Sequence, residues 1–263
     1  MKRQFRKMHG LGNDFVILDA RQDAIGMNED LARSLSDRRT GIGCDQLILL
    51  EPSAIADVRM RIWNSDGGEV EACGNATRCV ATLLGGDSTI ETKGGLLAGS
   101  AGTDSATVDM GRPRFAWDEI PLAYAVDTGA MPIGWERLAS PFAVNVGNPH
   151  LVFFVEDVEA IELKRLGPGI ERDPLFPERI NVNIAAIVDG AIRLRVWERG
   201  AGLTLACGTG ACAAAVAAIS RKLVSSPVEV RLPGGVLKIA WAPGEAIRMS
   251  GPAALVFTGE IDL

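Results

Sequence analysis

The sequence predicts a mixed α/β protein built from two related halves, each a sheet wrapped around a central helix. Three observations predict this fold class. A cysteine-bearing segment occurs twice, at residues 61–74 and 195–208, with six of its fourteen positions identical. Strand patterns outnumber helical patterns along the chain. Residues 211–218 are almost wholly small and apolar, so the helix they form is expected to be surrounded by protein.

Most of the expected elements are strands. Several alternate apolar and polar residues, as in a sheet with one covered face, and glycine and proline separate them. The expected strands lie at residues 15–18, 46–50, 58–63, 151–155, 180–188, 192–197, 228–232 and 237–241.

Helices are few. One is expected at residues 28–36, where Asn28 could cap the first turn and Leu31 and Leu35 have helical spacing. The other two follow the repeated cysteine segments, at residues 76–84 and 211–223.

Each repeated cysteine, Cys73 and Cys207, therefore lies near a helix N-terminus. Unpaired backbone N–H groups and the helix dipole stabilise a thiolate there, so lowered pKa values are predicted for both thiols. The glycines that follow, Gly74 and Gly208, permit close approach of a bound anion. Because related halves tend to pack about a pseudo-twofold axis, the two thiols are expected to flank one cleft.

Composition excludes several function classes. In a chain of 263 residues no apolar run reaches the roughly 18 that a membrane span needs. A net charge of −6 and a pI near 5.1 argue against a nucleic-acid surface. The basic first residues lead into no apolar signal segment, so a cytoplasmic protein is expected.

The five cysteines form neither a disulfide framework nor a zinc site, because their number is odd and their spacings depart from those of zinc ligands. With only two histidines in the chain, no metal is expected. The cysteines outside the repeated positions are interpreted as packing residues: Cys44, Cys79 and Cys212.

Six motifs, in family order and nearly end to end, resemble diaminopimelate epimerase. Together they are a specific signal, although each alone is weak. They are His9-Gly-Leu-Gly-Asn-Asp-Phe15, Arg39-Thr-Gly-Ile-Gly-Cys-Asp-Gln46, the segment from Asn64 to Asn75, Gly147-Asn-Pro-His150, Asn181-Val-Asn183 and the segment from Trp197 to Gly210.

The resemblance implies a cofactor-independent epimerase that interconverts LL- and meso-2,6-diaminopimelate, in lysine and cell-wall biosynthesis. It implies that Cys73 and Cys207 are the two bases, one on each face of the α-carbon. The backbone of Gly74, Asn75, Gly208 and Thr209 would hold the substrate carboxylate as charge grows on it.

The resemblance also assigns polar residues to the substrate, whose two ammonium and two carboxylate groups need donors and acceptors. The implied substrate contacts are Asn13, Gln46, Asn64, Asn148, Asn181, Glu198 and Arg199. His150 and Glu198 are implied to tune the cysteines. From spacing alone, Glu198 and Arg199 could instead be a solvated turn, and His150 a core histidine.

For the fold, the resemblance implies two pseudo-symmetric domains, each a mixed, mainly antiparallel sheet around a helix, and a homodimer. Residues 1–117 would form the first domain, to which a last strand at about 252–263 returns. Residues 118–251 would form the second, with the active site between them.

Other functions stay open at this point. The chain departs from the family pattern at Leu203, where the family commonly carries Glu, and also at Asn183 and residues 76–77. The alternative is therefore a related racemase that acts on histidine or on a proline derivative. A thiol redox protein is disfavoured because the repeated cysteines lie 134 residues apart. A non-catalytic binding protein could keep the cleft while losing one of the two bases, so the presence of both Cys73 and Cys207 argues against it.

Overall fold

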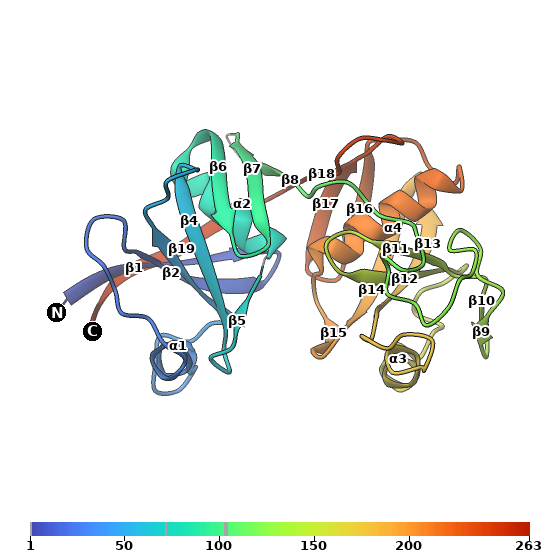
Figure 1. Ribbon diagram of the computed structural model, residues 1–263, viewed down its shortest axis with the longest axis horizontal. Helices are drawn as coiled ribbons and strands as arrows, with labels where there is room; N and C mark the ends of the chain where they lie inside the picture. The colour runs from blue at the N-terminus through green and yellow to red at the C-terminus, as the bar shows by residue number, and fades with distance from the viewer. Residues whose placement is uncertain (1, 72, 103–104) are drawn as a thin grey trace. The chain divides into compact units, whose positions relative to one another are not determined.

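The computed structural model describes residues 2–71, 73–102 and 105–263. The chain divides into two compact units (Figure 1). One unit consists of Met1–Asp109 and Ser250–Leu263, and the other of Met110–Met249. Each contains a mixed sheet and a helix packed against several of its strands.

The first unit contains strands from both ends of the chain. They are β1 (Lys2–Gly10), β2 (Asn13–Asp19), β3 (Gln46–Glu51), β4 (Val58–Asn64), β5 (Glu69–Val70), β6 (Gly86–Thr92), β7 (Gly95–Ala101), β8 (Ala106–Asp109) and β19 (Ala254–Asp262). Strand β1 is antiparallel to both β19 and β2. Strand β2 is parallel to β3, β3 is antiparallel to β4, and β4 is parallel to β6. The β6–β7–β8 meander completes a mainly antiparallel sheet.

Two helices belong to this unit. In α1 (Glu29–Ser36) the Asn28 side chain accepts a hydrogen bond from the backbone N–H of Leu31, as expected of an N-cap. Helix α2 (Gly74–Leu84) packs against β1, β6, β7 and β8, and its residues 75–81 are buried. Helix α2 is therefore the central helix of the unit.

The second unit repeats this arrangement. Its strands are β9 (Gly134–Trp135), β10 (Leu138–Ala139), β11 (Phe142–Asn145), β12 (Pro149–Phe154), β13 (Asn181–Val188), β14 (Ala191–Glu198), β15 (Gly202–Thr204), β16 (Val228–Leu232) and β17 (Gly235–Ala240). Strand β18 (Arg248–Gly251) begins in this unit and ends in the first. Helix α4 (Gly208–Ser220) packs against β11 to β14, β16 and β17, and α3 (Leu163–Glu171) contacts β13, β14 and β15. Every residue of α4 from 210 to 218 is buried, in agreement with its small, apolar sequence.

Strand register shows the internal duplication directly. Leu47 pairs with Trp63 across β3 and β4, and Val182 pairs with Trp197 across β13 and β14. The pairs β2–β3 and β12–β13 are both parallel, as are β4–β6 and β14–β16. The repeated sequence thus folds twice into the same succession of strands, each followed by a buried helix.

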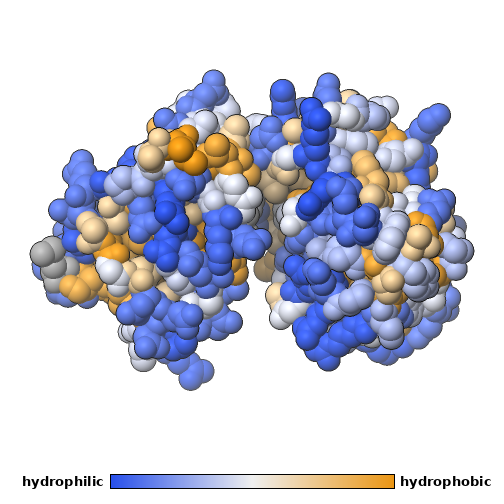
Figure 2. Space-filling view, in the orientation of Figure 1, coloured by the Kyte–Doolittle hydropathy of each residue, from blue (hydrophilic) through white to orange (hydrophobic). Residues whose placement is uncertain are grey.

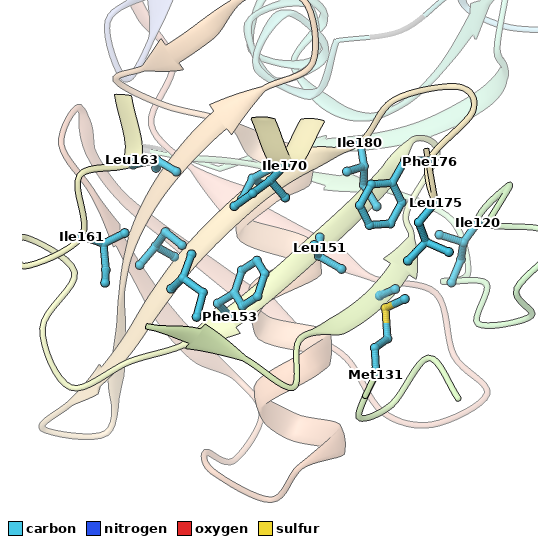
Figure 3. Packing of buried hydrophobic residues seen from close by; sticks show 14 of the residues in the cluster. Ile120, Met131, Leu151, Phe153, Ile161, Leu163, Ile170, Leu175, Phe176 and Ile180 are labelled. Atoms are coloured by element: carbon cyan, nitrogen blue, oxygen red, sulfur yellow. The ribbon is translucent and has the colours of Figure 1, made fainter. Parts of the chain in front are cut away.

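The core of the second unit surrounds β12 and β13 (Figure 3). Leu151 and Phe153 of β12 are fully buried and point into a cluster that also contains Leu163 and Ile170 of α3. Core substitutions such as Phe153→Ala cost about 3–5 kcal/mol in comparable sites. This packing anchors α3 against the sheet.

The predicted fold class is confirmed, and all eight expected strands are present within a few residues. The predicted starts of two helices were wrong. Helices α2 and α4 begin directly after the cysteines, at Gly74 and Gly208, because each cysteine is itself the N-cap. Helix α3 was not expected, since Gly167, Pro168 and Gly169 interrupt its sequence.

No helix in the described part of the chain is both long and apolar enough to span a membrane. The visible surface of both units is mainly hydrophilic, with an apolar patch over β6 and β7 in the first (Figure 2).

Candidate active site

Cys73 is half-buried at the N-cap of α2, beside two asparagine side chains. Its Sγ lies 3.8 Å from Oδ1 of Asn13, and Nδ2 of Asn75 donates to the same oxygen at 3.2 Å. Oδ1 of Asn75 accepts from Arg78 at 2.8 Å. The first half of the site therefore places two oriented amides beside its thiol, and both belong to the predicted substrate contacts.

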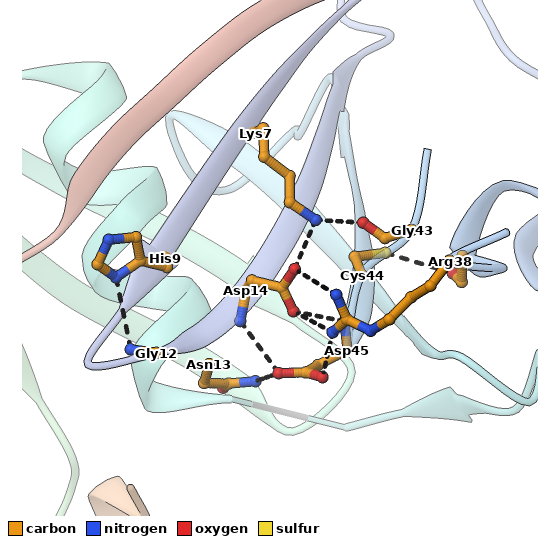
Figure 4. A network of polar contacts seen from close by, with 10 residues as sticks. Lys7, His9, Gly12, Asn13, Asp14, Arg38, Gly43, Cys44 and Asp45 are labelled. Atoms are coloured by element: carbon orange, nitrogen blue, oxygen red, sulfur yellow. Dashed lines mark hydrogen bonds and ion pairs between the residues drawn. The ribbon is translucent and has the colours of Figure 1, made fainter. Parts of the chain in front are cut away.

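The orientation of Asn13 is fixed by a network of charges (Figure 4). Its Nδ2 donates to Asp45 at 3.0 Å. The other end of the amide, Oδ1, therefore faces Cys73. Arg38 bridges Asp45 and Asp14, with nitrogen to oxygen distances of 2.7 and 2.6 Å. Lys7 pairs with Asp14 from the other side. Both aspartates lie inside the quoted motifs, and sequence reasoning gave them no role.

Burial alone would raise the pKa of Asp14, but the hydrogen bonds from Arg38 and Lys7 outweigh it and hold that pKa well below its ordinary value of 3.8. Asp14→Asn should lower the free energy of unfolding at pH 7 by about 3 kcal/mol, because it leaves two cations with a lost partner. Since the folded pKa is depressed, this stabilisation is complete above about pH 4 and is lost as the pH falls below it. Urea unfolding of both proteins at several pH values measures it.

The exposed Asp87→Asn variant is the control and should unfold like the wild type. An Asp14→Asn protein with wild-type stability at pH 7 would show that the network contributes nothing to folding.

Gln46 and Asn64 form a second amide pair of the first unit. They face each other across β3 and β4, and Nε2 of Gln46 donates to Oδ1 of Asn64 at 2.9 Å. Oε1 of Gln46 is buried without a hydrogen-bond partner. Such a group costs free energy unless a donor reaches it, as the ammonium group of a bound ligand could.

Cys207 lies at the N-cap of α4 and is only 3% exposed. Its thiol donates to Oε2 of Glu198 at 3.0 Å, and its Sγ accepts from the backbone N–H of Gly210 at 3.4 Å. The hydroxyl of Thr209 lies 3.5 Å away. Oε1 of Glu198 accepts from Thr204 at 2.5 Å, so both carboxylate oxygens are held.

The predicted lowering of the pKa is wrong for Cys207. Burial raises the pKa of this thiol well above 9.0, and the negative charge and hydrogen bond of Glu198 raise it further. The N–H of Gly210 and the hydroxyl of Thr209 lower it by less. A carboxylate in direct contact and the loss of water therefore outweigh the end of the helix, and Cys207 is a thiol at neutral pH.

His150 is fully buried in β12. Its Nε2 is 2.8 Å from Oδ1 of Asn148, and its Nδ1 is 3.1 Å from Nδ2 of Asn183. Burial lowers the pKa of His150 to about 3, a shift that Asn183 opposes and the charge of Arg199 favours. The imidazole is therefore a neutral link between two asparagines, and its implied effect on a cysteine stays a prediction.

His150 should stay neutral between pH 5 and 8 in NMR titrations of the imidazole nitrogens. Because its folded pKa of about 3 lies below the ordinary 6.5, the unfolded chain binds the extra proton between these values, and stability falls as the pH falls through that window. The His9→Gln variant assigns the signals. A His150 midpoint above pH 5 would contradict the buried neutral imidazole.

The β14–β15 turn carries Glu198 and Arg199. The backbone N–H of Arg199 donates to Oδ1 of Asn181 at 2.9 Å, and its guanidinium donates to the backbone oxygen of Glu178 at 3.0 Å. The backbone N–H of Gly200 donates to Glu171 of α3 at 3.1 Å. The turn is thus fixed by side chains rather than left as a solvated loop.

The packing cysteines are buried as predicted: Cys44, Cys79 and Cys212. Burial raises the pKa of Cys44, and it raises that of Cys79 to about 12. Neither thiol is activated.

The predicted site residues gather in two places. In the first unit Asn13 and Asn75 meet at Cys73, with Gly74 opening the helix, while Gln46 pairs with Asn64. In the second unit Glu198, Thr209 and Gly208 surround Cys207, Asn181 holds the turn, and Asn148 contacts His150. The opposition of the two cysteines across one cleft stays a prediction. Sequence reasoning missed Glu171, for which no motif or spacing gave a signal.

Known proteins resemble the whole chain. A family profile described as diaminopimelate epimerase matches residues 5–116 and 142–256. Curated proteins named diaminopimelate epimerase from Rhizorhabdus wittichii and Erythrobacter litoralis are 65% and 60% identical to the chain. The matches cover all of this chain and 97% and 98% of those proteins.

Solved structures of low sequence identity share the fold. A phenazine biosynthesis protein of the PhzF family from Bacillus anthracis matches with a TM-score of 0.71 at 15% identity, covering 100% of both chains. A probable proline racemase from Agrobacterium radiobacter matches with a TM-score of 0.72 at 17% identity, covering 99% of this chain and 93% of the other.

Proposed function

The chain belongs to the diaminopimelate epimerase family, and on this premise we propose that it interconverts LL- and meso-2,6-diaminopimelate by a two-cysteine mechanism that needs no cofactor. One observation carries the mechanism. The repeated cysteines occupy the same position in both halves, the N-cap of a buried helix that follows equivalent strands. An inversion needs two such groups, one on each face of the α-carbon.

The steps balance without an external proton or electron. A thiolate takes the α-proton, and the electron pair left on the α-carbon delocalises into the adjacent carboxylate. The thiol of the other cysteine delivers its proton to the opposite face. One thiol and one thiolate have then exchanged roles, and the reverse reaction starts from that state.

The surroundings of the two thiols support different resting states. Cys207 is almost fully buried and donates a hydrogen bond to the carboxylate of Glu198, and both features favour the thiol over the thiolate. Cys73 is less buried and lies among amides. We therefore assign the proton-donating thiol of the unliganded protein to Cys207, and the base that first removes a proton to Cys73.

The substrate would be held by the polar groups around both cysteines. The first-turn N–H groups of α2 and α4, at Gly74, Asn75, Gly208 and Thr209, would bind the carboxylate that gains charge. Asn13, Gln46, Asn64, Asn148, Asn181, Glu198 and Arg199 would bind the remaining ammonium and carboxylate groups. A fixed carboxylate beside a fixed guanidinium, in Glu198 and Arg199, suits a second amino acid group.

Exchange of the α-hydrogen in D2O tests the function. NMR of the reduced protein with LL-diaminopimelate, meso-diaminopimelate, histidine and proline should show exchange and epimerisation with diaminopimelate only. Exchange with another amino acid alone would keep the chemistry and change the substrate. No exchange with any of the four would overturn the epimerase proposal in favour of a binding protein.

The family resemblance also suggests a cytoplasmic homodimer. All five cysteines are free thiols, as a reducing compartment favours.

Strand β19 exposes about half of each of three apolar side chains, Leu255, Val256 and Phe257, which a second copy could cover. Light scattering should give twice the 27.9 kDa chain mass, and Val256→Lys should shift it toward the monomer.

A further inference from the structure

Helix α3 ends in a buried carboxylate that the proposed mechanism does not use. Glu171 is 3% exposed. It is the last residue of the helix, where the negative end of the helix dipole disfavours an anion, and burial disfavours it again. Nothing in the helix itself compensates for this placement, so its partners must lie elsewhere.

Those partners belong to the strand and turn that carry Glu198 and Arg199. Oε2 of Glu171 accepts from the indole N–H of Trp197 at 2.7 Å, and Oε1 accepts from the backbone N–H of Gly200 at 3.1 Å. The carboxylate thus forms hydrogen bonds to the residues that precede and follow the Glu198–Arg199 pair. Its nearest cation, Arg179, is 3.8 Å away and half-exposed, and by itself is a weak partner.

A second contact locks the same strand against α3. A methyl group added at Gly167 would lie 2.5 Å from Cδ2 of Trp197, so the helix and the indole ring touch without room for a side chain. Leu163 and Ile170 of the helix point into the core cluster of Figure 3. Helix α3 is therefore a rigid support that holds Trp197 by its ring and by its N–H.

The turn itself depends on this support. Gly200 has φ of 79°, a conformation that other residues adopt only at a cost, and its N–H is held by Glu171. Arg199 is held by Asn181, while Glu198 is held by Thr204 and Cys207. Of these anchors, Glu171 is the buried charge, and charge-assisted hydrogen bonds are the stronger kind.

We infer that Glu171 is a positioning residue that fixes the Glu198–Arg199 turn for substrate binding and for contact with the Cys207 thiol, an inference that rests on the proposed function. The carboxylate contacts Trp197 and Gly200. It acts by setting where the carboxylate of Glu198 and the guanidinium of Arg199 stand.

Glu171→Gln tests the inference. Glutamine keeps the size of the side chain, but its NH2 group replaces one of the two oxygens that accept from the Trp197 indole N–H and the Gly200 backbone N–H. We expect kcat/KM for diaminopimelate to fall by about 10²-fold, mainly through KM, as misplacement of binding groups would cause. Alkylation of Cys207 by iodoacetamide, followed peptide by peptide, should become several-fold faster, while Cys73 in the same sample keeps its rate. Hydrogen exchange should rise in the peptide containing residues 197–205.

Glu162→Gln is the matched control, since Glu162 lies at the N-cap position of α3, makes no side-chain capping hydrogen bond and is exposed. It should change none of these readouts. Trp197→Phe keeps an aromatic side chain but removes the indole donor and half of the bicyclic ring, and should reproduce a weaker form of the effect if Glu171→Gln folds poorly.

Two results would overturn the inference. One is an intact Glu171→Gln protein with unchanged KM and unchanged Cys207 alkylation. The other is an equal rise in alkylation of Cys73 and Cys207 with a lowered Tm, which would mean that Glu171 is only structural. Because alkylation and hydrogen exchange need no substrate, they test the positioning of the turn even if the wild-type protein fails to epimerise diaminopimelate.

Discussion

Replacing Cys73 or Cys207 by alanine should lower the rate of diaminopimelate epimerisation by roughly 10²–10⁴-fold, because each variant lacks the group that handles the proton on one face of the α-carbon. The two losses should be similar, since both faces are used in every turnover. The Cys73 side chain makes no capping hydrogen bond, so Cys73→Ala should change the free energy of unfolding little. Cys207→Ala loses the hydrogen bond from the Gly210 N–H to Sγ and should lower that free energy by about 1 kcal/mol. Polarimetry or chiral chromatography of the product mixture measures the effect.

Cys212→Ala is the control for this experiment. Cys212 lies within α4, of which Cys207 is the N-cap, and it is fully buried, so its replacement removes a packed sulfur atom. A cost of about 1 kcal/mol in stability and no change in activity are expected. Wild-type epimerisation by either Cys73→Ala or Cys207→Ala would contradict the two-base mechanism.

The elements that sequence patterns predicted well are those whose pattern is local. Strand β14 alternates apolar and charged residues, and α4 is apolar on every side, so each could be recognised without its neighbours. The duplication added the rest of the prediction, because two copies of one segment are expected to fold alike.

The elements that were missed depend on distant partners. Strand β1 reads as a charged segment, and it is a strand because β19, more than 240 residues later, pairs along it. Helix α3 contains two glycines and a proline, and packing of Leu163 and Ile170 onto the core compensates for their poor helical propensity. No single-sequence pattern contains that information.

The same distinction applies to the candidate site. Both cysteines were found because their surroundings repeat. Their places near helix N-termini followed from the helices expected behind them, but that each cysteine is itself the N-cap was not predicted. The state of Cys207 could not be predicted, because the chemistry of a thiol depends on which side chain the β14–β15 turn brings to it. Asp45 and Glu171 were missed for this reason too, since each acts through a residue far away in the sequence.

The second large effect is expected for Glu198→Gln, in which reactivity and catalysis should change in opposite directions. Glutamine removes the negative charge beside Cys207 and keeps the shape, so the pKa of the thiol should fall, although burial still holds it above its ordinary value. The pH at which iodoacetamide begins to alkylate Cys207 should therefore shift downward. The wild-type and variant profiles, resolved by peptide, measure this shift, and Cys73 provides an internal reference.

Catalysis should nevertheless become worse, because a more easily ionised Cys207 is a poorer resting thiol and the substrate loses a fixed anion for an ammonium group. The combined loss in kcat/KM should be about 10²-fold or more. Glu178→Gln is the matched control, since it alters an exposed carboxylate near the same turn and leaves the backbone oxygen that holds Arg199. If the alkylation profile of Cys207 does not move in Glu198→Gln, the carboxylate does not control the thiol. A loss of activity would then have to come from substrate binding alone.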